Sequence, residues 1–516
     1  MKKLNRRALI GASAAIALPT RIFAQTSTAM RPQLLQGVQT GDFSADGATI
    51  WSRSDRPARM IIDYATSESF TKSVRIEGPL ATEATDFTSR LRIANILPGS
   101  TVFYRVSYRD LDDDKAMSAP TLGRFTTPPI DDGRGGRDVS FTWSADTVGQ
   151  GFGINPDTGG MVIYEAMRKL APDFFVHSGD TIYGDNPLRP EVKLADGRIW
   201  RNTVTEPKSK VAETLDEFRG THRYNFLDDN LRAFNAEVPM LAQWDDHDVI
   251  DNWYWEKELS GDARYKEKSV RTLATNAQRA FREYMPLDDN LAAPMKLYRS
   301  FPYGPRLEVF RLDMRSYRNP NGANRETTPT HFLGEAQVTW LKQALKASKA
   351  TWKIVAASMP LGLVVYDDWR TKTGSEAIAN ADDGQPLGRE LEIAGLLAFI
   401  KRENIRNVAW ITGDVHYAAT HYYDPNNAAF QDFAPFYEFV AGPLCAGGFG
   451  PNALDGTFGP RVVFQKTPPQ GRVNTSPLEG SCNFGHIKID GRSGFMTVTH
   501  RDAAGAVLYA TDLTPS

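Results

Sequence analysis

Four short apolar runs each end in a polar cluster that is rich in aspartate, and this repeated pattern constrains the fold more than any other feature. The runs begin at Val139, Phe174, Val238 and Val408, and the clusters that follow read SAD, HSGDTIYGD, QWDDHD and TGDVH. Apolar runs bounded by such clusters are typical of buried strands. In an α/β sheet, ligands bind outside the carboxyl ends of the strands, so we expect the four clusters to converge there.

Converging carboxylates repel one another unless cations lie between them, because a like charge nearby disfavours ionisation. The pattern therefore predicts a metal site. Its candidate ligands are the polar side chains after the runs: Asp146, Asp180, Tyr183, Asp246, Asp414 and His416. A lone aspartate after a strand usually caps a helix or closes a turn, but four in order with a tyrosine and a histidine favour metal binding. Such ligands suit Ca²⁺, Mn²⁺, Fe³⁺ or Zn²⁺.

The chain has 516 residues, too many for one compact core, so we expect at least two domains. Residues 33–127 contain short alternating runs separated by turn clusters, which predicts an all-β sandwich. Residues 128–137 are rich in Gly and Pro and form the predicted boundary. Residues 138–516 alternate strand-like and helical runs, which predicts an α/β domain. The helical segments expected there are 159–170, 211–234, 333–348 and 387–403.

The N-terminus has the features of a targeting segment. It carries Arg6 and Arg7, an apolar run at 9–18 and the small residue Ala24. This predicts a cleavable signal peptide at 1–24, and the paired arginines resemble a twin-arginine (Tat) signal. The run is shorter than the roughly 20 apolar residues that span a bilayer. A membrane-anchored start is the alternative.

We therefore expect passage through the Tat translocase to the periplasm or the medium, and no integral membrane segment in the mature protein. The formal net charge of −2 gives no indication of a nucleic-acid binding domain.

The order of the motifs resembles a known family. Asp146 is followed by Gly179-Asp180-x-x-Tyr183, then by Asp246-His247, then by Gly413-Asp414-x-His416, which is similar to the calcineurin-like metallophosphoesterases. More narrowly, the chain resembles the PhoD-type alkaline phosphatase/phosphodiesterase family. The run LDMRSYR at 312–318 and the fibronectin-like pattern of residues 33–127 extend the resemblance over nearly the whole mature chain.

The resemblance implies an α/β fold in which a metallophosphoesterase β-sandwich, flanked by helices, follows a fibronectin type III-like all-β domain. It implies a ferric ion bound by Asp146, Asp180, Tyr183 and His416. It implies a second ion, Ca²⁺ or another divalent metal such as Zn²⁺ or Mn²⁺, bound by Asp180, Asp246, Asp414 and Asn252. The catalytic residues that it implies are Asp246 and His247, with His247 donating a proton to the leaving alkoxide after attack by a metal-bound hydroxide.

Two features depart from the family pattern. The best-known members of the family place a cysteine on the iron, whereas this chain has Asp146, an aspartate as in purple acid phosphatases. The metal identity is therefore left open. The segment 366–390 lacks the usual Trp-Asp-Gly-Tyr pattern. We expect this loop to border the pocket, which leaves the substrate preference open.

The predicted function is that of an exported, metal-dependent phosphoesterase acting on small or polymeric phosphate mono- or diesters. The alternative is a non-catalytic protein that binds a cell surface or a polysaccharide and keeps a degenerate phosphatase domain. Two further choices stay open. Arg315 and Arg318 either bind phosphate or pair with nearby acids, and Cys445 and Cys482 either form a disulfide or remain free thiols.

Overall fold

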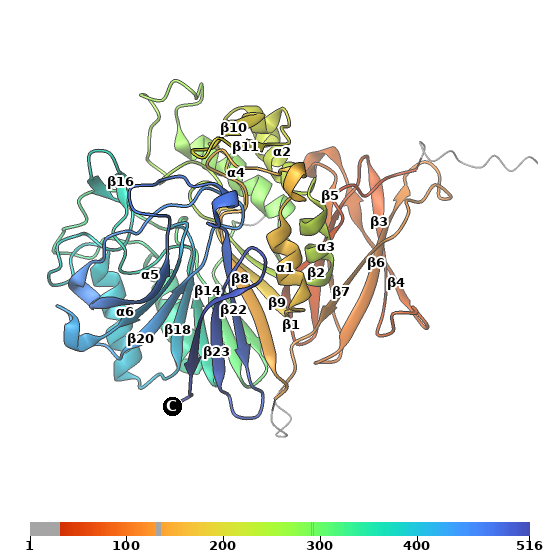
Figure 1. Cartoon of the computed structure of the whole chain (residues 1–516). Coiled ribbons are helices and arrows are strands. Elements are labelled where there is room, and N and C mark those ends of the chain that lie inside the picture. The colour runs from red at the N-terminus through yellow and green to blue at the C-terminus, as the bar shows by residue number, and fades with distance from the viewer. Residues whose placement is uncertain (1–30, 131–135, 290–291, 293) are drawn as a thin grey trace, which may run out of the picture.

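The computed structural model describes residues 31–130, 136–289, 292 and 294–516 (Figure 1). The predicted signal peptide, residues 1–24, lies outside the described residues. The chain forms an all-β unit beside a larger two-sheet sandwich that carries the helices (Figure 1).

The N-terminal unit is built from seven strands in two layers. One layer contains β1 (Val38–Ser44), β2 (Gly47–Arg53) and β5 (Thr88–Ile93). The other, in the order β4-β3-β6-β7, contains β3 (Ala58–Ala65), β4 (Val74–Ala81), β6 (Thr101–Asp110) and β7 (Thr121–Thr126). Alternate apolar side chains such as Ile50, Ile62 and Val106 are fully buried between the layers. This confirms the predicted all-β N-terminal domain.

The N-terminal unit and the larger sandwich share one sheet. Strand β1 runs parallel to β12 (Met240–Gln243), with Gly41 opposite Met240. A Cβ on Gly41 would lie 2.5 Å from the Met240 carbonyl oxygen, so the close approach requires glycine. A buried ion pair between Asp42 and Arg311 (2.7 Å) also joins the two parts. The two predicted domains are therefore continuous in structure.

Two sheets pack face to face in the larger part. The first continues from β12 through β9 (Phe174–Ser178), β8 (Val139–Ser144), β22 (Asn483–Ile489), β23 (Met496–Asp502) and β24 (Val507–Leu513). The second has the order β13 (Arg299–Tyr303), β14 (Leu307–Arg311), β15 (Trp352–Ala356), β18 (Val408–Thr412), β20 (Phe436–Val440), β19 (Ala418–Tyr423) and β21 (Pro460–Lys466). Phe141, Phe174, Ile354 and Phe439 are fully buried in the core shared by the two sheets. This confirms the predicted β-sandwich.

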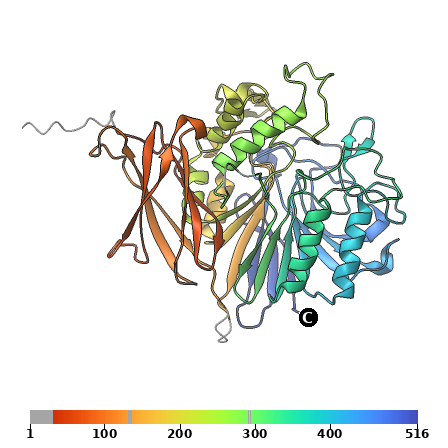
Figure 2. The same cartoon turned by 180° about the vertical axis from the view of Figure 1, so that it is seen from behind.

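Helices cover the outer faces of this sandwich. On the first sheet lie α1 (Val162–Lys169), α2 (Leu215–Asn225), α3 (Asp229–Glu237) and α4 (Val270–Tyr284). On the second lie α5 (Glu335–Ala347) and α6 (Glu390–Arg402), which run side by side in Figure 2. None of the described helices is long and apolar enough to cross a lipid bilayer.

The helix expected at 211–234 is wrong in extent, because the chain forms two helices there. The Asp228 side chain accepts a hydrogen bond from the Leu231 N–H (2.9 Å) and so caps a new helix, α3. Helix α4 was not predicted from the sequence.

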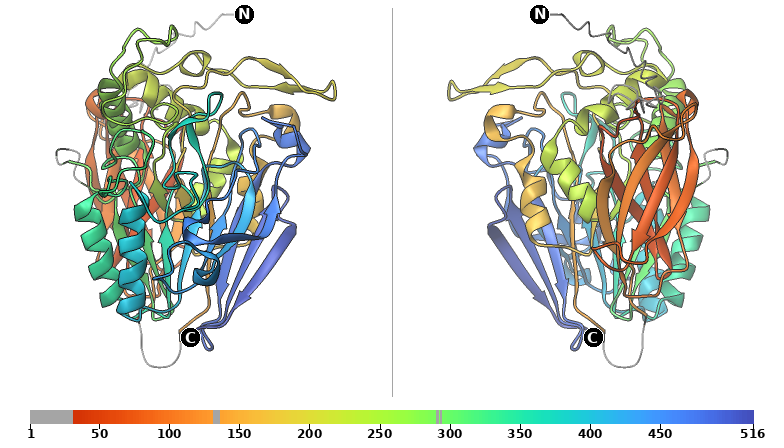
Figure 3. Two further views of the ribbon diagram at one scale, coloured as in Figure 1. Left: turned by 90° about the vertical axis from the view of Figure 1, so that its left-hand side faces the viewer. Right: turned by 90° about the vertical axis from the view of Figure 1, so that its right-hand side faces the viewer.

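Two small hairpins complete the fold. They are β10 (Glu191–Lys193) with β11 (Ile199–Arg201), and β16 (Tyr366–Asp368) with β17 (Thr373–Ser375). Both lie toward the end of the molecule at which strand β8 finishes (Figure 3).

Candidate metal centre

The predicted ligands come together where parallel strands end. Strands β8, β9 and β12 are parallel neighbours in the first sheet, and β18 lies between parallel strands of the second. Their ligand atoms form three groups, each within 4.8 Å: Asp146, Asp180 and His416; Asp180, Asp246 and His247; and Asp245, Asp246 and Asp414. Asp180 and Asp246 each belong to two groups, so the three form one continuous cluster.

Most of the candidate metal ligands have unusual backbone geometry. Asp146, Asp180, Asn252, Asp414 and His416 all have φ between 52° and 72°, the left-handed region. Non-glycine residues rarely adopt this region, which costs of the order of 1–3 kcal/mol per residue. Such strain persists where the surrounding fold imposes it and concentrates at functional sites. Left-handed backbone at five candidate ligands therefore marks these loops as a candidate functional site.

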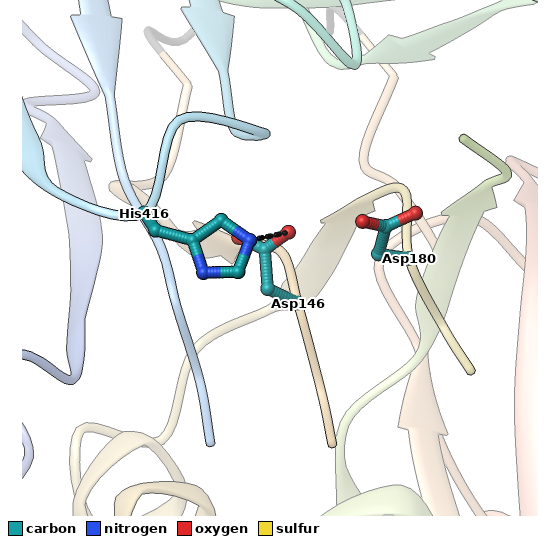
Figure 4. Close-up of side chains that lie close together, drawn as sticks. All are labelled: Asp146, Asp180 and His416. Carbon is teal, nitrogen blue, oxygen red and sulfur yellow. Dashed lines mark ion pairs between the residues drawn. The ribbon is translucent and has the colours of Figure 1, made fainter. Parts of the chain in front are cut away.

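The first group is built around His416, whose ring faces the Asp146 carboxylate (Figure 4). The His416 Nδ1–H donates to the Gly447 carbonyl (2.5 Å), and burial lowers the pKa of His416 to about 4. The ring is therefore neutral, and Nε2 keeps the lone pair that a metal requires. This atom lies 2.9 Å from the Tyr183 hydroxyl and 3.5 Å from Asp146 Oδ1.

The second group is reached through Asp180. Its Oδ1 accepts a hydrogen bond from the backbone N–H of His247 (3.1 Å). Asp246 Oδ2 in turn accepts the backbone N–H of Asn252 (2.8 Å). The Asn252 side-chain Nδ2 donates to the Asp367 carbonyl (3.1 Å), so it is directed at the β16–β17 hairpin. Binding of a metal by Asn252 stays a prediction.

The electrostatics of the cluster favour bound cations. Burial, assisted by the charge of Asp245, raises the pKa of Asp146 to about 8. Burial also raises the pKa values of Asp180 and Asp414 well above normal, and the charge of Asp246 adds to both shifts. Two buried oxygens, Asp146 Oδ2 and Asp245 Oδ2, have no hydrogen-bond partner among the described residues. An oxygen-rich donor set with orphaned carboxylate oxygens fits hard or borderline metal ions.

Asp185 is a further residue of the candidate site that was not assigned from the sequence. Its Oδ1 lies 2.8 Å from His247 Nδ1, and its Oδ2 accepts the Asp251 N–H (3.1 Å). Burial lowers the pKa of His247, but the charges of Asp185 and Asp246 outweigh burial and raise it well above 6.5. The Tyr183 ring stacks on the imidazole at 4.3 Å. Asp185 follows Tyr183 by two residues, which was the available signal.

Arg315 and Arg318 lie in a buried network of ion pairs, which confirms the prediction that they pair with nearby acids. The Arg315 guanidinium contacts the carboxylates of Asp245 and Glu376, and its Nη2 is 3.6 Å from Asp246 Oδ1. Arg318 pairs with Glu376 at 2.7 Å. Arg315 therefore holds Asp245 and Asp246 in place within the cluster of candidate ligands.

Cys445 and Cys482 are both free, buried thiols in the structure. The Cys445 N–H donates to the Asp146 carbonyl (3.1 Å), but its Sγ lies 3.7 Å from the Gly153 carbonyl oxygen. None of the described metal-ligand groups contains a sulfur atom.

The sandwich and the acids at its strand ends define the chain as a protein of the metallophosphoesterase class. The solved structure titled "Structure of PhoD" matches with a TM-score of 0.68 at 20% identity, covering 93% of this chain and 89% of that one. A purple acid phosphatase isolated from yellow lupin (Lupinus luteus) seeds matches with a TM-score of 0.57 at 11% identity, covering 94% and 74%. At these identities the two structures establish the fold.

Within that class, the chain belongs to the PhoD-like phosphatase family, whose sequence profile matches residues 141–500. The profile of the N-terminal domain of these phosphatases matches residues 19–129. Alkaline phosphatase D of Bacillus subtilis (strain 168) is 26% identical over 441 residues, which cover 80% of this chain and 70% of the relative. The chain is therefore a phosphoesterase, as its sequence predicted.

Proposed function

We propose that this phosphoesterase hydrolyses phosphate mono- or diesters with two metal ions held at the ends of β8, β9, β12 and β18. The observation that carries the proposal is the continuous cluster in which Asp180 and Asp246 are each shared between groups of ligand atoms. A carboxylate shared by two cations about 3.5–4 Å apart is the arrangement used for displacement at phosphorus.

The two ends of the cluster differ in donor chemistry. At one end, Tyr183 and His416 join Asp146, and a phenol, an imidazole and carboxylates together suit Fe³⁺. At the other end, Asp246 and Asp414 offer carboxylates, which suit Ca²⁺. Zn²⁺ and Mn²⁺ are compatible with the same donors. When bound, the ions supply charge that neutralises the phosphoryl oxygens and lower the pKa of water.

The chain's own residues position the proton donor. Asp185 binds Nδ1 of His247, so the opposite nitrogen, Nε2, is the one that donates a proton to the leaving alkoxide. The stacked Tyr183 ring fixes the plane of the imidazole. Behind them, Arg315 holds Asp245 and Asp246 in place. These contacts orient His247, the general acid, before the substrate binds.

Export is also proposed. It rests on the basic and apolar pattern of residues 1–24, with Arg6 and Arg7 as the Tat signal and cleavage after Ala24. The expected location is the periplasm or the medium. N-terminal sequencing of the exported protein should begin at Gln25, and an exported protein that retains Met1 would contradict the proposal.

Chelation tests the metal requirement. We expect the protein dialysed against a chelator to lose turnover of a phosphomonoester and a phosphodiester, and to regain it when Fe³⁺ with Ca²⁺, or Zn²⁺ or Mn²⁺, is added. Both esters should be assayed side by side, because their relative rates decide between phosphatase and phosphodiesterase. Full turnover by protein shown by elemental analysis to be free of metal would contradict the proposal.

A further inference from the structure

The β16–β17 hairpin presents an exposed aromatic side chain. Trp369, in the turn, is 69% exposed, whereas every other tryptophan is buried or partly buried among the described residues. The guanidinium carbon of Arg370 lies over the indole ring, 4.7 Å from its centroid. A tryptophan held open to solvent beside a cation offers a flat surface on which another ring can stack.

The hairpin is joined to the metal centre by hydrogen bonds. Asn252 donates its backbone N–H to Asp246 (2.8 Å) and its side-chain Nδ2 to the Asp367 carbonyl (3.1 Å). The Asp367 carboxylate accepts from Asn321 Nδ2 (3.0 Å) and lies 3.6 Å from Lys257 Nζ. Lys257 Nζ also donates to the Asn252 carbonyl (3.1 Å). The base of the hairpin is therefore fixed against the loop that carries the second group of ligands.

The exposed indole is close along the chain to the contact that joins the hairpin to the ligand loop, because the Asp367 carbonyl accepts from Asn252. Trp369 follows Asp367 by two residues, and two extended residues span about 7 Å. A groove of about 500 Å³ runs along the hairpin, and Lys372 and Arg325 are among its lining residues. Arg370, Lys372 and Arg325 outnumber the two carboxylates of the hairpin, Asp367 and Asp368, so the hairpin and its groove carry a small net positive charge, which suits an anionic ester.

We propose that Trp369 and Arg370 determine specificity by stacking on a flat ring in the esterified group of the substrate. The substrate class is then phosphate esters that carry an aromatic or heteroaromatic ring, such as nucleotides, in preference to small aliphatic esters. This inference rests on the proposed phosphoesterase function and deepens it.

Two esters with similar leaving groups test the proposal. Adenosine 5′-phosphate and glycerol 3-phosphate both release a primary alcohol, so their intrinsic reactivities are alike and the ring is the main difference. The same comparison is made with a dinucleotide and a glycerophosphodiester. The measured quantity is the ratio of kcat/KM for the ring-bearing ester to kcat/KM for the aliphatic ester, in metal-loaded protein.

Trp369→Ala should lower this ratio about tenfold, because stacking of a base on an exposed aromatic ring contributes at this level. Trp369→Phe should restore most of it, and Arg370→Met should lower it less than Trp369→Ala does. The matched control is Phe495→Ala, which removes an exposed ring (37% exposed) from the β22–β23 turn. That turn lies at the amino end of β8, remote from the cluster.

These measurements distinguish failure of the specificity inference from failure of the proposed phosphoesterase function. An unchanged ratio in Trp369→Ala, with normal thermal stability, overturns the inference while metal-dependent turnover upholds the proposed function. An equal loss for both esters also overturns it, because the hairpin would then support the site in general. Wild-type protein that hydrolyses none of the four esters with metals bound overturns both the inference and the proposed function.

Discussion

The metal-free protein should lose stability as the pH rises, because Asp146 is buried beside other acids. Burial and the charge of Asp245 raise the pKa of Asp146 from 3.8 to about 8. Between these values the folded protein binds a proton that the unfolded chain releases. The stabilising contribution of the protonated acid is therefore complete below pH 3.8 and is lost as the pH rises through about 8.

The magnitude of this loss of stability follows from the shift in the pKa of Asp146. Between pH 5 and 8 the loss is roughly 4 kcal/mol, at about 1.36 kcal/mol per pH unit. Because the two parts share one sheet, the cooperative unit is about 480 residues, and the loss corresponds to a fall of roughly 4 °C in the melting temperature. The raised pKa values of Asp180 and Asp414 act in the same direction.

The assay is thermal unfolding of chelator-treated protein at several pH values, compared with Asp146→Asn. The asparagine cannot ionise, so the variant's melting temperature should fall less between pH 5 and 8. Metal-loaded wild-type protein should show no comparable fall, because bound cations replace the proton. Equal pH dependence in metal-free wild type and Asp146→Asn would show that protonation of Asp146 does not control the stability.

Three other predictions concern residues around the ions. Asp185→Asn should lower kcat by about 10²-fold or more with little change in metal content, since it removes the partner that orients His247 as general acid; unchanged kcat would oppose this. Arg315→Met should destabilise the protein by about 3–5 kcal/mol in chemical denaturation, because Asp245 is left buried and unpaired; a change below about 1 kcal/mol would be inconsistent with the network. Tyr183→Phe should remove any phenolate-to-iron absorption band without unfolding the chain; colourless, active wild-type protein with only divalent metals would refute the ferric assignment.

Local pattern was sufficient to predict the clustering of the acids. Short buried strands give apolar runs in the sequence, and parallel neighbours such as β8, β9 and β12 end at the same edge. The aspartates that directly follow these strands, such as Asp146 and Asp246, therefore had to meet.

The partners of those acids could not be predicted, because they depend on contacts between distant segments. Arg315 reaches Asp245 across 70 residues, and His247 meets Asp185 across 62. The sequence places Asp185 two residues after the predicted ligand Tyr183, but neither of these long spacings relates an acid to its partner. The joining of β1 to β12 likewise depends on the absence of a side chain at Gly41, which sequence alone does not relate to Met240.

We propose that one cluster of shared carboxylates holds two catalytic ions. The most direct test is elemental analysis of wild type, Asp180→Asn and the exposed control Asp432→Asn, each with its turnover. Asp180 belongs to two of the three ligand groups, whereas the Asp432 side chain is 66% exposed and pairs with Lys401. We predict two ions per chain in wild type and in Asp432→Asn, and loss of both ions and of turnover in Asp180→Asn. Asp180→Asn protein with full metal content and near-normal turnover would show that Asp180 is not a shared ligand.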